Sequence, residues 1–199
     1  MHDWRFKISS DVELVNNALM LLGDNSITSL ADDTVRARLA NQIYGVTRDA
    51  VLRSHPWNCA VARATLAKLT PDPPFGWDSQ FQLPSDPYCL RVLALNDNEE
   101  WACPGDVFKI EGRKLLSNTA TANIRFIQRI TDPNQYDTLL YEALSARLAA
   151  KMAYPVTGST SLAEAMLKLY EGFLKDARTI DGQEGSPDKS DVTILTDIR

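Results

Sequence analysis

The side chains best suited to catalysis are few in this sequence and stand far apart. The 199 residues include only two histidines, His2 and His55, and three cysteines, Cys59, Cys89 and Cys103. No two of the cysteines form the C-x-x-C pair that a zinc ribbon needs. A lone histidine beside a proline and a tryptophan is more often a packing or capping residue than a general base. We therefore expect no metal site, no cofactor and no catalytic histidine.

Two acidic pairs and one serine-rich segment are the remaining candidates for chemistry. Asp32 and Asp33 could bind a cation, but carboxylates at the start of a helix are explained more simply as caps. Glu99 and Glu100 are the only adjacent glutamates, and on a strand they would point to opposite faces, so they could not flank one glycosidic bond. Residues 158–161, Gly-Ser-Thr-Ser, are predicted to cap a helix. The sequence has no phosphate-binding loop, dinucleotide motif, serine-hydrolase elbow or zinc-protease motif.

Five basic residues in the middle of the chain are candidates for binding. They are Lys109, Arg113, Lys114, Arg125 and Arg129, and with Glu111 as the one acid among them they give a local charge of +4. Such a patch could face a nucleic-acid backbone. We favour the alternative of a solvated sheet face beside an acidic neighbouring subunit.

The last residues combine acidic and apolar side chains. From residue 181 to residue 199, five acids stand against two basic residues, so this segment carries −3 of the total charge of −5. A short apolar island within it consists of Val192, Ile194, Leu195 and Ile198. Such an island is typical of strand addition to the sheet edge of a partner. We therefore predict that residues 181–199 form an extended arm that docks on a partner through these four side chains.

The composition is that of a globular protein: 44% of the residues are hydrophobic and 24% are charged. No apolar run approaches the roughly 20 residues that a membrane helix needs. The N-terminus has no apolar core of signal-peptide length, so we expect synthesis in the cytoplasm. The acidic net charge argues against a sequence-specific DNA-binding regulator, although a pair of N-terminal helices would suit one.

Four stretches have helical periodicity. The first runs over residues 10–22, with Ser10 and Glu13 at capping-box spacing and Gly23 after its end. The second starts at Asp32 or Asp33 and runs to about residue 54. The third starts with Asp132 as its cap and is broken by Pro155 and Gly158, and the fourth covers residues 161–179. The apolar stripes predicted to face the core are Val35, Leu39, Ile43, Val46 and Ala50; Tyr136, Leu140, Ala143, Leu144 and Leu148; and Leu162, Met166, Leu169, Phe173 and Ala177.

Residues 77–130 have a different texture, with apolar and polar side chains in alternation. Strands are predicted at 88–94 and 124–129, and a tight hairpin at 108–116 with its turn at Gly112. The fold class is therefore α+β, mainly α: a four-helix body with an inserted small antiparallel sheet and an extended C-terminal arm. The predicted layout is a helical part at 1–70, a β-region at 71–131, a second helical part at 132–180 and the arm at 181–199.

Four stretches, taken in order, carry a resemblance to a known family. Residues 15–60 contain the helix end ALMLLG, the segment ITSLADD and the run RDAVLRSHPWN. The other three are FGWDSQFQLPSDPYCLRVL (75–93), FKIEGRKLLSN (108–118) with the strand IRFIQRITDP after it, and YEALSARLAAKMAYPVTGS (141–159) with LYEGFLKDARTIDGQEG after it. Together they cover most of residues 10–185 and resemble the tail tubular protein A family of tailed bacteriophages. No single stretch is a chemical signature, but their order and spacing make the resemblance specific.

The resemblance implies a structural virion protein rather than an enzyme. Members of the family are helical proteins with an inserted β-region, and their copies form a twelve-fold adaptor or "gatekeeper" ring. The ring joins the portal to the tail tube or nozzle, and DNA passes through it without specific binding. The implied partners are other copies of the chain, the portal protein and the next tail protein, with no membrane and no cofactor. The implied location is the virion tail, where the basic residues listed above would line the lumen or contact a neighbouring subunit.

Two other functions remain as alternatives. The nearer one is a head-completion connector of a long-tailed phage or a gene-transfer-like particle, which is the same kind of part in a different assembly. The other is a polysaccharide or cell-wall hydrolase carried on the tail, which needs a pair of carboxylates in a cleft.

Overall fold

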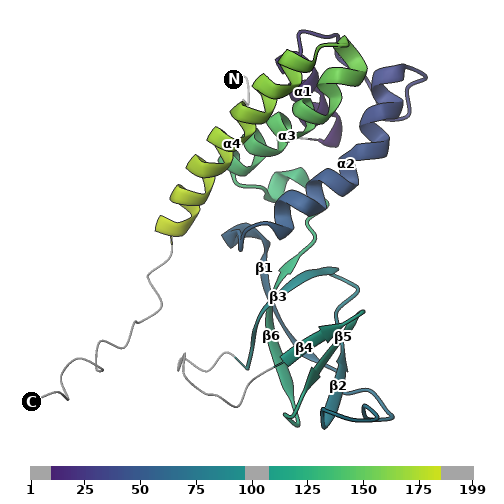
Figure 1. Ribbon diagram of the computed structural model, residues 1–199, viewed down its shortest axis with the longest axis vertical. Coiled ribbons are helices and arrows are strands. Elements are labelled where there is room, and N and C mark those ends of the chain that lie inside the picture. Colours follow the sequence, from purple (N-terminus) through teal and green to yellow (C-terminus); the bar gives the residue numbers. More distant parts are fainter. Residues whose placement is uncertain (1–9, 97–107, 185–199) are drawn as a thin grey trace, which may run out of the picture.

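Within residues 10–96 and 108–184, which the computed structural model describes, four α-helices form a body and six β-strands form a region at its end (Figure 1). The helices are α1 (Asp11–Leu21), α2 (Val35–Arg53), α3 (Thr138–Thr157) and α4 (Thr160–Gln183). The strands, all between α2 and α3 in sequence, are β1 (Val61–Leu66), β2 (Ser79–Gln82), β3 (Cys89–Leu95), β4 (Phe108–Glu111), β5 (Lys114–Ser117) and β6 (Ala122–Gln128). The protein is therefore α+β and mainly α, as its sequence predicts.

Local capping residues place the start of α1 and the end of α3. The amide of Glu13 donates to Ser10 Oγ at 3.2 Å, and the amide of Ser10 donates to Glu13 Oε2 at 3.0 Å, which is the predicted capping box. Gly23 and Gly158 follow their helices with φ of 70° and 71°, a left-handed conformation that glycine adopts without a steric penalty. Ser159 then caps α4 by accepting from the amide of Leu162 at 3.2 Å, as predicted for this segment.

The predicted cap of α2 was wrong. Thr34 is the cap, and its hydroxyl accepts a hydrogen bond from the amide of Ala37. Asp32 lies two residues before this cap, and its carboxylate instead accepts from the amides of Thr28 and Ser29 at 2.8 and 3.1 Å. The acidic side chain therefore organises the preceding loop instead of the helix.

The start of α3 differs from the prediction, and of the two residues predicted to break it only Gly158 lies at its end. Asp132 caps a short 3-10 turn at Pro133–Gln135, and α3 begins only after Asp137, which accepts from the amide of Leu139 at 2.9 Å. Pro155 lies inside α3 and does not end it. A proline in the last turn removes one backbone hydrogen bond, which a helix packed on three neighbours tolerates.

The core of the body is built around α3, which packs against α1, α2 and α4. Leu140, Leu144 and Leu148 are buried as predicted, whereas Tyr136 precedes the helix and is half-buried. Burial raises the pKa of Tyr136 to about 12. None of the helices in the described ranges is long and apolar enough to cross a membrane.

The apolar stripe predicted to be the inner face of α2 is only partly correct: Leu39 and Ile43 pack against the core, whereas the other three residues are exposed. Val35 and Val46 are 67% and 70% exposed. The buried face is formed instead by Ala37, Ala40, Tyr44, Thr47 and Val51. The stripe predicted to be the inner face of α4 is also partly wrong. The inner face of this helix contains Leu162, Met166 and Ala177 as predicted, but it continues through Ala163, Tyr170 and Leu174 rather than through Leu169 and Phe173.

The β-region consists of two three-stranded antiparallel sheets where the sequence predicted one. Their strand orders are β1-β6-β3 and β2-β5-β4. The predicted hairpin is confirmed as β4 and β5, with Gly112 at φ 59° in its turn. The sequence missed β1 and β2, and β1 begins at residue 61, before the predicted boundary at 71.

A second, smaller core fills the space between the two sheets. Phe81 from β2, Leu115 from β5 and Phe126 from β6 are almost fully buried in it. The next residue of β6, Ile127, belongs to the core of the helical body. Neighbouring strand residues point to opposite faces, so β6 contributes to both cores.

Candidate functional site

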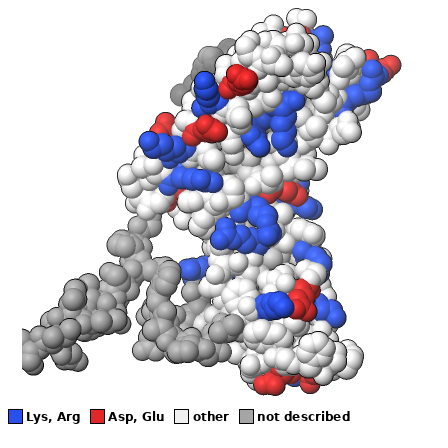
Figure 2. Space-filling model, in the orientation of Figure 1, with Lys and Arg blue, Asp and Glu red and all other residues white. Residues whose placement is uncertain are grey.

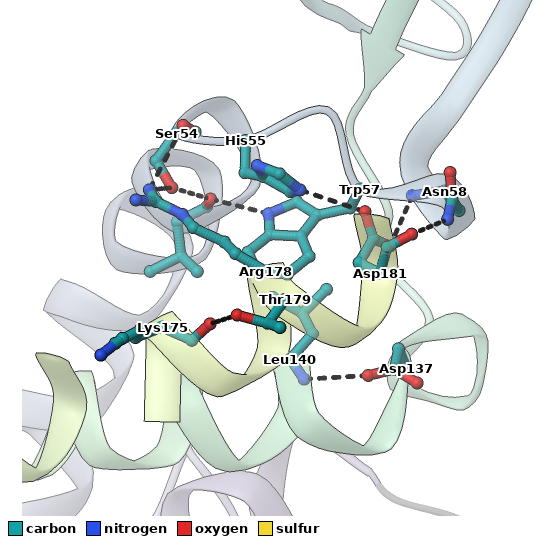
Figure 3. Close-up of polar contacts among 11 residues, drawn as sticks. Ser54, His55, Trp57, Asn58, Asp137, Leu140, Lys175, Arg178, Thr179 and Asp181 are labelled. Carbon is teal, nitrogen blue, oxygen red and sulfur yellow. Dashed lines mark hydrogen bonds and ion pairs between the residues drawn. The ribbon is translucent and has the colours of Figure 1, made fainter. Parts of the chain in front are cut away.

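The helical body and the β-region meet at a waist, formed by residues 54–60 on the way out of the body and 129–137 on the way back. Lys and Arg side chains are visible at this junction in Figure 2, and polar contacts between its segments are drawn in Figure 3. Two groups of side chains join the parts. We call them the pin (His55, Asn58 and Asp181) and the clamp (Asp49, Arg53, Tyr88, Arg113 and Arg129).

The pin is centred on the carboxylate of Asp181, which is 8% exposed near the end of α4 (Figure 3). One of its oxygens, Oδ1, accepts from the backbone amide of Asn58 at 2.9 Å, and Oδ2 lies 3.1 Å from Nε2 of His55. The side-chain amide of Asn58 donates in turn to the carbonyl of Asp181 at 2.7 Å. A single acidic residue thus attaches α4 to the segment that leads into β1.

Trp57 packs against the His55 side chain of the pin. Its side chain is fully buried, and its indole nitrogen donates to the carbonyl of Val51 in α2 at 3.1 Å. The imidazole of His55 packs edge-on against it, with ring centroids 4.7 Å apart and an interplanar angle of 67°. Arg178, one turn before Asp181, donates to the hydroxyl of Ser54 at 3.2 Å. These contacts make His55 a packing and hydrogen-bonding residue of the waist, in line with the interpretation favoured from sequence.

The clamp connects α2 with the β-region through arginines. Arg129, just after β6, donates from Nε to Oδ2 of Asp49 at 2.8 Å, and its Nη2 forms an ion pair with the same oxygen at 2.6 Å. Arg53 donates to the carbonyl of Leu90 in β3. Arg113, from the β4–β5 turn, donates to the carbonyl of Cys89 at 3.0 Å. Each guanidinium therefore links two elements that are distant in sequence.

The aromatic ring of Tyr88 contacts two guanidinium groups of the clamp. The guanidinium carbons of Arg113 and Arg129 are 4.0 and 4.2 Å from the centroid of its ring. Cation–π attraction of this kind is worth about 0.5–1 kcal/mol at exposed sites. Beside the ring is a groove of about 590 Å³, whose charged lining residues are Asp49, Arg53, Arg91, Arg113 and Arg129. Four cations against one carboxylate make this groove positive.

The predicted basic patch is divided by the fold. Arg113 and Arg129 come together at Tyr88. Lys109 and Lys114 lie on β4 and β5, where Lys109 pairs with Glu111 at 2.9 Å and Lys114 donates to Gln80 at 3.1 Å. The fifth member, Arg125, lies on β6 of the other sheet, opposite Arg63. The five residues therefore do not form one continuous surface.

The other predicted candidates have structural roles or lie outside the described residues. Burial raises the pKa of the thiols of Cys59 and Cys89, which makes both poor nucleophiles. No group of three or more His, Cys, Asp or Glu side chains in residues 10–96 and 108–184 is arranged to hold a metal ion. Cys103, the Glu99–Glu100 pair and the docking residues Val192, Ile194, Leu195 and Ile198 lie outside those ranges.

The residue that sequence reasoning missed is Asp181. It was assigned to the extended acidic arm, but it belongs to the last turn of α4 and is buried. A signal was present: Asp181 follows Ala177 by four residues and therefore shares the inner face of the helix. A carboxylate at a core-facing position needs a partner, and His55 and Asn58 supply it.

No protein-family model matches this chain, and no curated protein matches it.

Proposed function

We propose that this protein is a structural adaptor of a bacteriophage tail. Its copies form a twelve-subunit ring that joins the portal to the tail tube or nozzle and lets DNA pass. The sequence support for this proposal is the resemblance to the tail tubular protein A family, carried by residues 15–60, 75–93, 108–118, 124–133, 141–159 and 169–185. The mainly helical body with a β-region inserted between α2 and α3 agrees with the architecture that the resemblance implies.

The waist is the observation that carries the proposal. Asp181 attaches α4 to the segment that leads into β1 through His55 and Asn58. Arg129 and Arg53 attach the β-region to α2, while Arg113 links the β4–β5 turn to β3. An adaptor between two larger assemblies has to hold its two ends at a fixed distance and angle. Two groups of contacts across one junction supply that rigidity, and they leave their side chains engaged in structure rather than in turnover.

The positive groove of the clamp favours a protein contact over DNA binding. Arg53, Arg113 and Arg129 already donate to groups of this chain, so the groove presents an electrostatic field more than a set of free donors. Such a field attracts an acidic surface of a neighbouring subunit. A lumen that DNA slides through would work best without this many cations.

The proposal includes a docking role for the segment after Glu184. Truncation after Glu184 removes Val192, Ile194, Leu195 and Ile198 and keeps the Asp181 pin, so it separates docking from folding. We expect the truncated protein to keep its melting temperature and to bind a portal less tightly than the full chain. Full docking of the truncated protein would remove the arm from the proposal.

Mass photometry of the purified chain, alone and mixed with the portal protein encoded beside it, tests the proposed function. A ring adds about 270 kDa to the portal, the mass of about twelve copies of this 22.2 kDa chain. The matched control is the portal mixed with an unrelated folded protein of similar mass, which is expected to leave the portal mass unchanged. A well-folded chain that leaves the portal mass unchanged would refute the adaptor function.

A further inference from the structure

The groove of the clamp holds positive charge that the described carboxylates do not balance. Arg129 is paired with Asp49, the one acid of the lining. Arg53 and Arg113 donate to backbone carbonyls, which leave the charges of both guanidiniums uncompensated. Arg91 is exposed on β3 and has no ion pair among the described residues. Three unbalanced arginines in one groove repel one another, so the groove favours a bound anion.

The same groove has an apolar wall. Ile110 of β4 is 40% exposed there, and Leu90 and Val92 of β3 are half-buried. Both β3 and β4 are edge strands, and their outer edges have no partner strand among the described residues. A ligand that fits the groove therefore has carboxylates on one side and apolar side chains on the other, as an extended acidic peptide does.

A segment of this chain has that pattern. Residues 190–198 contain two carboxylates, Asp191 and Asp197, and no basic residue. The two basic residues of the stretch 185–199, Lys189 and Arg199, lie on either side of it. In an extended conformation alternate side chains point to opposite sides. Both carboxylates then lie on one side, and the opposite side consists of Val192, Ile194, Thr196 and Ile198.

The segment starts close to the groove of its own chain. Arg178 on α4 donates to Ser54, the neighbour of Arg53, which lines the groove. Glu184, the last described residue of α4's end, lies six residues after Arg178, or about 9 Å along the helix. From there residues 185–190 span up to about 20 Å when extended. The covalent link therefore gives this segment a high effective concentration at the groove, which an unlinked acidic peptide lacks.

We propose that residues 190–198 bind in the groove of the clamp of their own chain. Their two carboxylates face the arginines of the groove, and their apolar side covers Ile110 and Val92. The contact does not depend on the proposed ring. Where the ring forms, the portal and the groove compete for the same segment, so docking of the arm on the portal frees the groove for a neighbouring subunit.

Hydrogen exchange of the full chain, measured by mass spectrometry, tests the contact. The amides of residues 190–198 are expected to exchange about threefold more slowly than in a free synthetic peptide of the same sequence. Protection of this size reports a local equilibrium and leaves the global melting temperature almost unchanged. Arg91→Glu and Asp191→Arg are each expected to remove the protection, and the double variant that carries both is expected to restore it. Because Arg91 is exposed and has no ion pair among the described residues, its replacement is expected to leave the fold intact, which circular dichroism checks.

Two further variants are controls matched for charge. Arg38→Glu reverses an exposed arginine near the start of α2, whereas the groove lies at the end of that helix. Asp188→Arg reverses a carboxylate just before the binding stretch. Both are expected to leave the protection unchanged. Unprotected amides in the wild type, an equal loss in the controls or no recovery in the double variant would overturn the inference. So would protection that grows with protein concentration, because it would place the segment in the groove of another copy.

This proposal and the adaptor function fail in different ways. Protection that the charge reversals remove and restore, together with no binding to the portal, would refute the adaptor function and retain the groove contact. Ring formation on the portal by a chain whose residues 190–198 are unprotected before docking would retain the function and refute the groove contact.

Discussion

The pin and the clamp cross the same waist with different chemistry. The pin depends on one buried carboxylate, Asp181, and on two partners from one short segment. The clamp spreads its contacts over three arginines, an aromatic ring and a half-buried acid. Loss of one member therefore leaves unsatisfied buried groups in the pin, whereas the remaining members of the clamp still hold. The difference teaches that the end of α4 is attached to the waist through a few atoms, whereas the attachment of the sheets to α2 is spread over several side chains.

The largest effect is expected from Trp57, on which the pin is built. Replacement by alanine in Trp57→Ala removes a fully buried indole and the hydrogen bond to Val51. We expect a loss of about 3–5 kcal/mol in the free energy of unfolding, measured by urea titration. An unchanged midpoint would mean that the pin does not depend on the packing beneath it.

The second largest effect is expected from Asp181 itself. In Asp181→Ala the amide of Asn58 and the imidazole of His55 lose their acceptor inside the waist. We expect the free energy of unfolding to fall by about 2–3 kcal/mol. The matched control is Asp176→Ala, which removes an exposed carboxylate from the same helix. Hydrogen exchange of the last turns of α4 should rise in the first variant only. Equal stability of the two variants would contradict a concentrated attachment.

A smaller effect is expected from the clamp. The ion pair between Arg129 and Asp49 is partly exposed, so a double-mutant cycle of Arg129→Ala and Asp49→Ala is expected to give a coupling of about 1 kcal/mol. Raising the salt concentration should reduce this coupling and leave the effect of Asp181→Ala almost unchanged. A coupling as large as the effect of Asp181→Ala would remove the contrast between the two groups.

The smallest effect concerns Asp32, a carboxylate outside the waist. Hydrogen bonds from the amide of Thr28, and then of Ser29, hold its pKa below the ordinary value of 3.8. A group with a lowered folded-state pKa stabilises the fold above its unfolded-state pKa, and that contribution is lost as the pH falls through the folded-state value. The stability difference between wild type and Asp32→Asn should therefore be constant from about pH 5 to 7 and shrink below about pH 4. A difference that grows below pH 4 would contradict the assigned cause.

Sequence patterns correctly predicted features that depend on interactions between neighbouring residues, such as helix caps and turns. The capping box of Ser10 and Glu13, the hairpin turn at Gly112 and the end of α3 at Gly158 depend on residues within a few positions of each other. All three were predicted correctly. The α2 cap failed for a related reason: Thr28 and Ser29 compete for the carboxylate of Asp32, and the sequence alone does not rank such competitors.

Features that depend on contacts between residues far apart in sequence were predicted less well. Periodicity identified α2 as amphipathic, but its small inner residues, such as Ala37 and Ala40, are less conspicuous than the valines of its outer stripe. The strand β1 was missed because Ala62 and Ala64 give little contrast with their neighbours. The pin was invisible because 123 residues separate Asn58 from Asp181 and no local rule joins them.

The insertion of the β-region between α2 and α3 has a consequence for how the chain is made. Helices α1 and α2 leave the ribosome first, but α3, the helix that both pack against, begins only at residue 138. At roughly 5–20 residues per second, the 84 residues between α2 and α3 take about 4–17 seconds to synthesise. During that interval the apolar sides of α1 and α2 have no native cover. Nascent chains stalled before residue 138 should therefore bind holdase chaperones, and chains stalled far enough past residue 157 for α3 to emerge should release them.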